Sequence, residues 1–553
     1  MFQRFLSFNR VCFVCAFLVS VALVLSCGFV GVSLAQTAVA EKYSTDFEEV
    51  APDALPADAE FATAAGSAAD REAIYLKVLE LREKITDAVN NNPPMETALL
   101  NEIPVTKAAP THVAGSKADA VDLPADFLIG RNVRNSRALT GSTLAEPAAA
   151  NEGKFIFYMG NTYASYSIDG GVNWVNVVIP AGPADAPILC CDPDVIYDKA
   201  RGVIFWSFLY TNAAQTNGVV RIFVRPVINL ANACSYTFDP GGVADNVLPD
   251  YPHLGLSNDF LYLTNNNIGP NGWAGSQVRR LNADQMASCV GVVTNTFTHV
   301  GVVGQRVFVP AEGARETMYW GAMEAANSIR IFSWPEAAAG PSSVVKNISL
   351  STFANPDCRG GVGNFDFIER STAFSIAGFR MRSAVGANRL SFFWNVGADA
   401  AHTQGHVHSA AFRQNDLALI AEPHIFNNAF CFGFPAVSAN ERGDLGLTIA
   451  AGGRLGGGGN AARGFVGLDD DYTAGFSFGT LVLTAAGTHN RSDGRFGDYF
   501  NIHPHSPAGL FFTATNYSLL NGTLPANVNA RYIEFGRDRD RASYFGWRDA
   551  VAP

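Results

Sequence analysis

Two short stretches of the sequence each combine side chains that can transfer protons or attack an electrophilic carbon. Asp250, Tyr251 and His253 form the first stretch, and Asp498 and Tyr499 open the second. Carboxylates, phenols and imidazoles are the groups that cleavage of a glycosidic bond requires. We interpret these five as candidate catalytic residues. The alternative is that the repeated Asp caps a turn and the repeated Tyr packs between sheets.

Five further charged residues are candidates for binding a substrate. They lie near the starts of similar segments and are Arg315, Arg359, Arg495, Asp192 and Asp194. A guanidinium group binds a carboxylate through two parallel hydrogen bonds, so the three arginines would suit an acidic sugar. We therefore expect them to converge in one funnel with Tyr251 or Tyr499. Scattering over the outer surface would contradict this expectation.

These candidate residues lie where a repeated unit begins. Each unit starts with polar or aromatic residues, continues as an apolar strand, turns, and ends in a second apolar strand. Clear copies start at Asp192, Asp250, Phe434 and Asp498, and weaker copies lie near residues 308–310 and 363–366. The starts are separated by about 55 to 70 residues, which suits a four-stranded β-propeller blade with one long loop.

The composition favours an all-β fold. The chain of 553 residues contains 52 Gly, 40 Phe and 16 Tyr, and only 16% of its residues are charged, which suits short strands joined by tight turns. Roughly 420 residues from position 126 onward would make six or seven blades, and we favour seven. Because inner strands line the axial channel of a propeller, the repeat starts would meet there. We expect a strand near residues 531–535 to complete the first blade.

One predicted turn carries a specific motif. Ser167, Asp169, Gly171 and Trp174 match Ser-x-Asp-x-Gly-x-x-Trp, in which the hydroxyl and carboxylate bind backbone N–H groups and Gly accepts a positive φ. Trp174 would pack beneath the hairpin. This segment resembles the Asp-box, or BNR repeat, of sialidase-like β-propellers. The resemblance implies that the box lies in an outer turn, away from the active site.

The resemblance also implies a type of chemistry. Sialidases combine three substrate-binding arginines, an acidic acid/base and a Tyr nucleophile activated by Glu. Their first arginine lies in an Arg-Ile-Pro motif, which this sequence lacks, and Gly130, Arg131 and Asn132 occupy a comparable place. We expect a secreted carbohydrate-active enzyme, a hydrolase or a lyase, that cleaves a glycosidic bond of an acidic glycan or polysaccharide. The alternative is a non-catalytic extracellular propeller that binds a glycan or a protein.

The N-terminal part of the chain differs from the rest. Residues 1–35 have the form of a signal peptide, with Arg4 and Arg10 preceding or flanking an apolar run over residues 11–32. Left uncleaved, this segment would anchor the chain in a membrane. We expect residues 36–125 to be a linker or propeptide with a short amphipathic helix within residues 70–90. Residues 126–553 form the predicted propeller, in an extracellular or periplasmic chain.

The cysteines suit an oxidising compartment. Removal of the signal peptide would leave six of them: Cys190, Cys191, Cys234, Cys289, Cys358 and Cys431. An even number permits complete pairing, although the sequence does not select the connectivity. Cys190 and Cys191 are adjacent, and a ring between neighbours is strained, so we expect each to bond a different partner.

We expect no cofactor, no metal and no nucleic acid. His402, His406 and His408 have the spacing His-x-x-x-His-x-His, but no other ligand type accompanies them, and we interpret them as one face of a strand or loop. The formal net charge of -11 repels nucleic acid.

Overall fold

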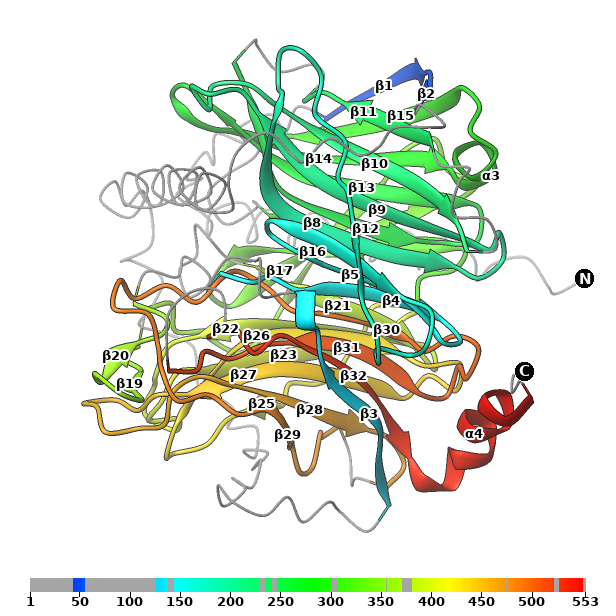
Figure 1. Cartoon of the computed structure of the whole chain (residues 1–553). Coiled ribbons are helices and arrows are strands. Elements are labelled where there is room, and N and C mark those ends of the chain that lie inside the picture. Colours follow the sequence, from blue (N-terminus) through cyan, green and yellow to red (C-terminus); the bar gives the residue numbers. More distant parts are fainter. Residues whose placement is uncertain are drawn as a thin grey trace, which may run out of the picture. The chain divides into compact units, whose positions relative to one another are not determined.

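The computed structural model describes residues 43–54, 126–137, 144–227, 234–240, 246–300, 307–354, 356–369, 380–472, 476–521 and 527–550. Seven sheets of three to five strands follow one another along these residues and form a seven-bladed β-propeller, as the sequence predicts (Figure 1). The expected signal peptide and the expected helix within residues 70–90 lie outside the described residues.

The first four blades run from residue 148 to residue 347. Blade 1 contains β4 (Ala148–Glu152), β5 (Phe155–Gly160), β6 (Tyr163–Ser167) and β7 (Val175–Val177). Blade 2 contains β8 (Ile188–Asp198), β9 (Val203–Thr211), β10 (Gly218–Pro226) and β11 (Cys234–Phe238). Blade 3 contains β12 (Leu248–Leu256), β13 (Phe260–Gly269), β14 (Gly272–Asn282) and β15 (Val292–His299). Blade 4 contains β16 (Thr317–Ala325), β17 (Ser328–Pro335) and β18 (Ser342–Asn347), with the extended segment 307–312 on its inner side.

The last three blades complete the ring. Blade 5 contains β21 (Arg382–Gly386), β22 (Arg389–Val396), β23 (His406–Arg413), β24 (Leu419–Ala421) and β25 (His424–Ile425). Blade 6 contains β26 (Cys431–Ala439), β27 (Leu445–Gly452), β28 (Arg463–Asp469) and β29 (Val482–Ala485). Blade 7 contains β30 (Asn501–Pro504), β31 (Phe512–Asn516), β32 (Arg531–Arg537) and β3 (Phe127–Arg134). The weak repeat near residue 363 is not a blade, because it forms the small hairpin of β19 (Arg359–Gly360) and β20 (Phe365–Asp366).

The ring closes in blade 7 and not, as predicted, in blade 1. Strands β4 to β7 complete blade 1 without help from the C-terminus, so the expectation for residues 531–535 is wrong. Instead β3, which precedes blade 1, pairs with β32 and becomes the outermost strand of blade 7 (Figure 1). Pairing of β3 with β32 covers the strand edges that these two strands present to each other.

Two strands of the N-terminal segment extend the outer edges of neighbouring blades. Strand β1 (Tyr43–Val50) pairs antiparallel with β15 of blade 3 over its whole length. Strand β2 (Asp53–Ala54) pairs with β11 of blade 2. Residues expected to be linker thus contribute two edge strands. The described residues also include the short helices α3 (Ala283–Ala287) and α4 (Arg541–Ala550), and none of the described helices has the length and apolarity needed to cross a membrane.

Large apolar side chains from adjacent blades fill the spaces between the sheets. Phe157 of blade 1 meets Trp206 of blade 2 with ring centroids 5.2 Å apart, and Trp206 stacks on Phe223 at 4.2 Å. All three side chains are buried. Such aromatic pairs account for the aromatic-rich strands of the sequence, because each strand of a propeller blade faces apolar surface on both sides.

Five of the inner segments begin at a residue with positive φ. These residues are Glu146, Asp192, Tyr251, Val307 and Phe434, with φ between 39° and 63°. The register shifts at this point in β8, β12 and β26, as in a β-bulge that re-aims the following side chains. Asparagine side chains of the preceding blade accept N–H groups from three of these positions, in the pairs Asn161 with Asp192, Asn266 with Val307, and Asn395 with Phe434. These bonds hold a conformation that residues other than glycine rarely adopt.

The turn between β6 and β7 has the hydrogen bonds that its sequence predicts. Ser167 Oγ accepts the N–H of Gly171 at 2.7 Å, and Asp169 Oδ1 accepts the N–H groups of Val172 and Asn173 at 3.0 and 2.9 Å. Gly171 has φ +86°, and Trp174 is buried beneath the turn. Burial works against ionisation, but these bonds lower the pKa of Asp169 to about 2. The motif therefore stabilises a hairpin.

Three disulfides join the six cysteines of the propeller. They link Cys190 with Cys191, Cys234 with Cys289, and Cys358 with Cys431. The expectation of complete pairing is confirmed. The expectation that the adjacent cysteines bond different partners is wrong, because the bulge of β8 at this point bends the backbone enough for neighbours to pair.

Candidate functional site

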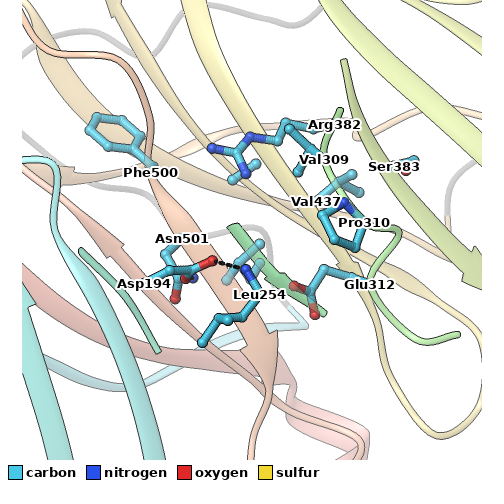
Figure 2. Close-up of a pocket in the computed structure, with 12 residues that line it drawn as sticks. Asp194, Leu254, Val309, Pro310, Glu312, Arg382, Ser383, Val437, Phe500 and Asn501 are labelled. Carbon is cyan, nitrogen blue, oxygen red and sulfur yellow. Dashed lines mark hydrogen bonds between the residues drawn. The ribbon is translucent and has the colours of Figure 1, made fainter. Parts of the chain in front are cut away.

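The inner segments of six blades surround one pocket. Its cavity volume is about 20 Å³. Three charged side chains line it: Asp194 from β8, Glu312 from the inner segment of blade 4, and Arg382 from β21. Figure 2 shows that these side chains come from different strands and surround the same space. The repeat starts of several blades thus meet at the axis, and we call this group of residues the axial site.

Asp194 organises the floor of the axial site. Its carboxylate accepts hydrogen bonds from the Leu254 N–H at 2.8 Å (Figure 2), from the Asn501 amide at 3.1 Å, and from His253 Nδ1 at 3.2 Å. Burial opposes ionisation, yet the hydrogen bonds from His253 and from the Leu254 N–H lower the pKa of Asp194. Asp194 is therefore an anion that holds three donors in place.

His253 is a neutral imidazole at physiological pH. Burial and the nearby Arg382 cation lower its pKa to about 4, against the opposing effect of Asp194. Its Nδ1–H donates to Asp194, and its Nε2 lies 3.3 Å from Arg382 Nη2, from which it accepts a hydrogen bond. The tautomer is therefore set by its two neighbours. Arg382 Nη1 lies 3.4 Å from Nδ1 of the same ring, so the guanidinium lies along both ring nitrogens.

Two arginines surround the candidate tyrosines. Arg382 Nη2 donates to the Tyr251 hydroxyl at 3.2 Å, and its guanidinium lies 5.4 Å from the centre of the Tyr499 ring. Arg380 lies over the Tyr251 ring at 4.7 Å and forms an ion pair with Asp498 at 3.0 Å. Burial raises the pKa of Tyr251 to about 12, although the arginines oppose this effect. Tyr251 is therefore a neutral phenol with a cation at its hydroxyl group.

Tyr499 and Glu146 belong to the same buried network. The Tyr499 hydroxyl donates to the Pro193 carbonyl at 2.8 Å, and its ring lies 5.6 Å from that of Tyr251. Burial and the charge of Glu146 raise the pKa of Tyr499 well above its usual value. Glu146 is buried at the start of blade 1.

A second histidine holds a proton beside the pocket. His503 Nδ1 lies 3.1 Å from Glu312 Oε2, and its Nε2 lies 2.8 Å from the Val195 carbonyl oxygen. Both neighbours are acceptors, so both ring nitrogens donate. Burial disfavours the charged ring, but the Glu312 carboxylate outweighs it and raises the pKa of His503. The pair is an imidazolium bound to a carboxylate that lines the pocket.

The structure brings together most of the residues that the sequence singles out. Asp192 is buried and accepts the Tyr251 N–H at 3.0 Å, and Asp250 is buried on β12. The sequence-predicted residues in this neighbourhood are Asp192, Asp194, Asp250, Tyr251, His253, Asp498 and Tyr499. Asp498 is tied to Arg380, so its carboxylate holds the arginine in position.

The three predicted arginines do not converge in the pocket. Arg315 is exposed, and Arg359 is exposed on β19 with an ion pair to Asp357 at 2.6 Å. Arg495 is buried but does not line the pocket. Arg382 lines the pocket in their place, and Arg380 lies over the Tyr251 ring; both belong to the start of blade 5, where the sequence shows no repeat start. Glu146 precedes Pro147, as Asp192 precedes Pro193, so this residue-Pro pair indicates that Glu146 also starts an inner strand.

Comparisons with known proteins give distant likenesses only. No family model matches the sequence, and no curated protein matches it. An α-L-arabinofuranosidase of Fusarium graminearum with arabinobiose has 9% identity and a TM-score of 0.32 over 71% of this chain and 92% of that one. The Trypanosoma rangeli sialidase has 7% identity and a TM-score of 0.35 over 74% and 60% of the two chains. The Aleuria aurantia lectin with α-methyl-L-fucoside has 14% identity and a TM-score of 0.33 over 65% and 98%. At such scores the likeness says nothing about substrate or reaction.

Proposed function

We propose that this propeller is a secreted carbohydrate-active enzyme that binds an acidic glycan or polysaccharide in the axial site and cleaves a glycosidic bond. One observation carries the proposal: the Arg382 guanidinium lines a pocket together with Asp194 and Glu312, and each of these carboxylates is bonded to a buried histidine. Guanidinium groups recognise carboxylates, and carboxylate–imidazole pairs transfer protons.

The protonation states favour elimination next to a sugar carboxylate. A substrate carboxylate bound by Arg382 would neutralise that cation and release Nε2 of His253, which now accepts from it. His253 Nε2 would then take the proton from the carbon beside the carboxylate. As the double bond forms and the glycosidic C–O bond breaks, the leaving oxygen needs a proton. Glu312, which lines the pocket, would pass on the proton that the His503 imidazolium donates to it.

A hydrolytic route through a tyrosine nucleophile has less support. A phenol attacks well only when it is readily deprotonated. Burial raises the pKa of Tyr251 to about 12 and that of Tyr499 well above its usual value. The Tyr499 hydroxyl also donates to a backbone carbonyl. Both tyrosines are better suited to positioning Arg382 than to forming a covalent intermediate.

The disulfides support the cellular location in this proposal. Three of them join cysteines of the propeller, and disulfides persist in oxidising compartments outside the cytoplasm. We therefore place the protein outside the cell or in a periplasm.

A non-catalytic glycan-binding propeller is the second candidate function. The observation in its favour is that the axial site is bonded internally, since Arg380 pairs with Asp498 and Tyr499 with Pro193. A site of this kind can bind a ligand at its rim without performing chemistry.

The experiment incubates the purified protein with a panel of uronic-acid polysaccharides and sialosides. A new unsaturated-uronate absorbance indicates elimination, and new reducing ends without that absorbance indicate hydrolysis. Arg382→Gln should abolish turnover, whereas Arg315→Gln, which changes an exposed arginine outside the pocket, should retain it. Retained binding without turnover supports the second candidate. Neither binding nor turnover across the panel contradicts both.

A further inference from the structure

Three histidines of blade 5 bring their ring nitrogens together. His402 lies in the connection between β22 and β23, His406 is the first residue of β23, and His424 is the first residue of β25, which pairs with β23. One ring nitrogen from each lies within 4.8 Å of the others. We call these three residues the histidine cluster. It is separate from the axial site, because none of its members lines that pocket.

The hydrogen bonds of His406 leave one nitrogen available. His406 Nδ1 lies 3.1 Å from the Gln404 carbonyl oxygen, which can only accept, so Nδ1 carries the proton. Nε2 of the neutral ring then accepts the Nδ1–H of His424, 3.0 Å away, and a metal ion bound by both nitrogens would take the place of this proton. Two ligand nitrogens of one tetrahedral zinc ion, with Zn–N bonds of about 2.0–2.1 Å, lie about 3.3 Å apart, which is close to this separation.

The third member has an unsatisfied nitrogen. His402 Nδ1 lies 3.0 Å from both oxygens of Asp399 and donates to that carboxylate. Its Nε2 is buried and has no hydrogen-bond partner, in a residue that is only 6% exposed. A buried acceptor without a donor is costly. A cation between the three rings would satisfy it.

We propose that the histidine cluster binds one divalent transition-metal ion, with zinc as the favoured species, through Nε2 of His402, Nε2 of His406 and Nδ1 of His424. Three imidazole nitrogens suit zinc, copper and nickel, and a fourth tetrahedral position would be open to water or another ligand. Asp399 and the Gln404 carbonyl would accept hydrogen bonds from the other ring nitrogens of His402 and His406. A metal-bound histidine commonly donates its other N–H to a carboxylate or a carbonyl oxygen in this way.

The surrounding residues hold the three rings in position before any ion arrives. Asp399 Oδ1 also accepts the N–H groups of Ala401 and His402 at 2.7 Å, which fixes the loop. His408 stacks on His424 with ring centroids 4.2 Å apart, and its own Nδ1 lies 2.9 Å from Ser351 Oγ. His408 is therefore a positioning residue, and the third ligand is His424.

The topology places the cluster at the end of blade 5 where Arg382 of the axial site also lies. In the antiparallel run of β21, β22 and β23, the connection between β22 and β23 lies at the end where β21 begins. Arg382 is the first residue of β21, and His402 lies in that connection. The ion would tie this loop and β25 to β23, in the outer part of blade 5.

The test titrates zinc into the full-length purified protein, free of any polyhistidine tag and treated with a chelator. Wild type should bind one equivalent, and Co²⁺ in its place should give the visible d–d bands of a four-coordinate centre. His402→Gln and His424→Gln should weaken zinc binding at least about 100-fold, and Asp399→Asn about 10- to 100-fold. His489→Gln, outside the cluster, should leave the affinity unchanged.

Two results would overturn the proposal. One is wild-type protein that binds no stoichiometric zinc. The other is wild-type affinity in a folded His402→Gln variant, with folding checked by circular dichroism. If a ligand variant does not fold, the wild-type stoichiometry, the cobalt spectrum and Asp399→Asn still decide: an absent d–d spectrum, or an Asp399→Asn affinity equal to that of wild type, counts against the site.

Discussion

The axial site and the histidine cluster are both groups of buried titratable side chains, but their charges are balanced differently. In the axial site three acids each have a basic partner within hydrogen-bonding distance; the pairs are Asp194 with His253 at 3.2 Å, Glu312 with His503 at 3.1 Å, and Asp498 with Arg380 at 3.0 Å. In the cluster His402 is bonded to the carboxylate of Asp399, His406 and His424 are bonded to each other, and Nε2 of His402 has no partner.

This difference has consequences for binding. A network of paired acids and bases keeps its shape without a ligand. A ligand that binds there has to replace internal hydrogen bonds with its own. Arg382 illustrates this, because a substrate carboxylate would replace Tyr251 and His253 as its acceptors. In the histidine cluster Nε2 of His402 is an acceptor without a donor, and a cation would satisfy it. The axial site is therefore suited to an anionic organic ligand, and the histidine cluster to a metal ion.

The largest expected effect is the loss of the central acid of the balanced network. Asp194→Ala would leave the Leu254 N–H, the Asn501 amide and the His253 Nδ1–H without their buried acceptor. We expect the free energy of unfolding to fall by about 3–5 kcal/mol, as measured by urea denaturation. Asp416→Ala, which removes an exposed ion pair to Arg413, should leave stability nearly unchanged. Equal stability of the two variants would show that the axial network is not what holds these strands.

A smaller effect is expected from the cluster in metal-free protein. His402→Gln removes the hydrogen bond from Nδ1 to Asp399, while Nε2 has no partner to lose. The free energy of unfolding should fall by about 1 kcal/mol in the presence of a chelator. Zinc should then raise the melting temperature of wild type and not that of the variant. A loss as large as that of Asp194→Ala would mean that both regions are held by their own bonds, and the contrast between them would disappear.

The smallest effect is a pH dependence within the axial site. The Glu312 carboxylate raises the pKa of His503 above its ordinary value of about 6.5. A raised pKa in the folded state stabilises the protein below the ordinary pKa, and this stability is lost as the pH rises through the folded-state value. The difference in unfolding free energy between wild type and His503→Gln should therefore be larger at about pH 5.5 than at about pH 9. His489→Gln serves as the control, and a difference that grows with pH would contradict the ion pair.

The sequence predicts the fold well because the signals for it are local and repeated. Residue-Pro pairs at Asp192, Tyr251 and Phe434 mark bulges of inner strands, and each strand pair follows at a short distance. Closure of the ring is not local. Both chain ends carry a strand of ordinary appearance, and their sequences do not indicate that β3 joins β32 in blade 7.

The axial site is predicted in part for the same reason. Tyr251 and His253 follow a repeat start, whereas Arg382 opens a blade without the residue-Pro pair and is found only when the sheets are assembled. The histidine cluster shows the same limit. His402 and His406 are close in sequence, but His424 joins them through the pairing of β25 with β23, which no local pattern indicates.

The most direct test of the proposed function compares an acidic polysaccharide with its carboxyl-reduced, neutral form in affinity electrophoresis. Wild type should bind the acidic form at least about ten times more tightly, because the Arg382 guanidinium recognises the carboxylate. Arg382→Gln should lose this preference, and Arg315→Gln should keep it. Equal binding of the two forms by wild type, or a preference that survives in Arg382→Gln, would contradict an axial site built for an acidic glycan.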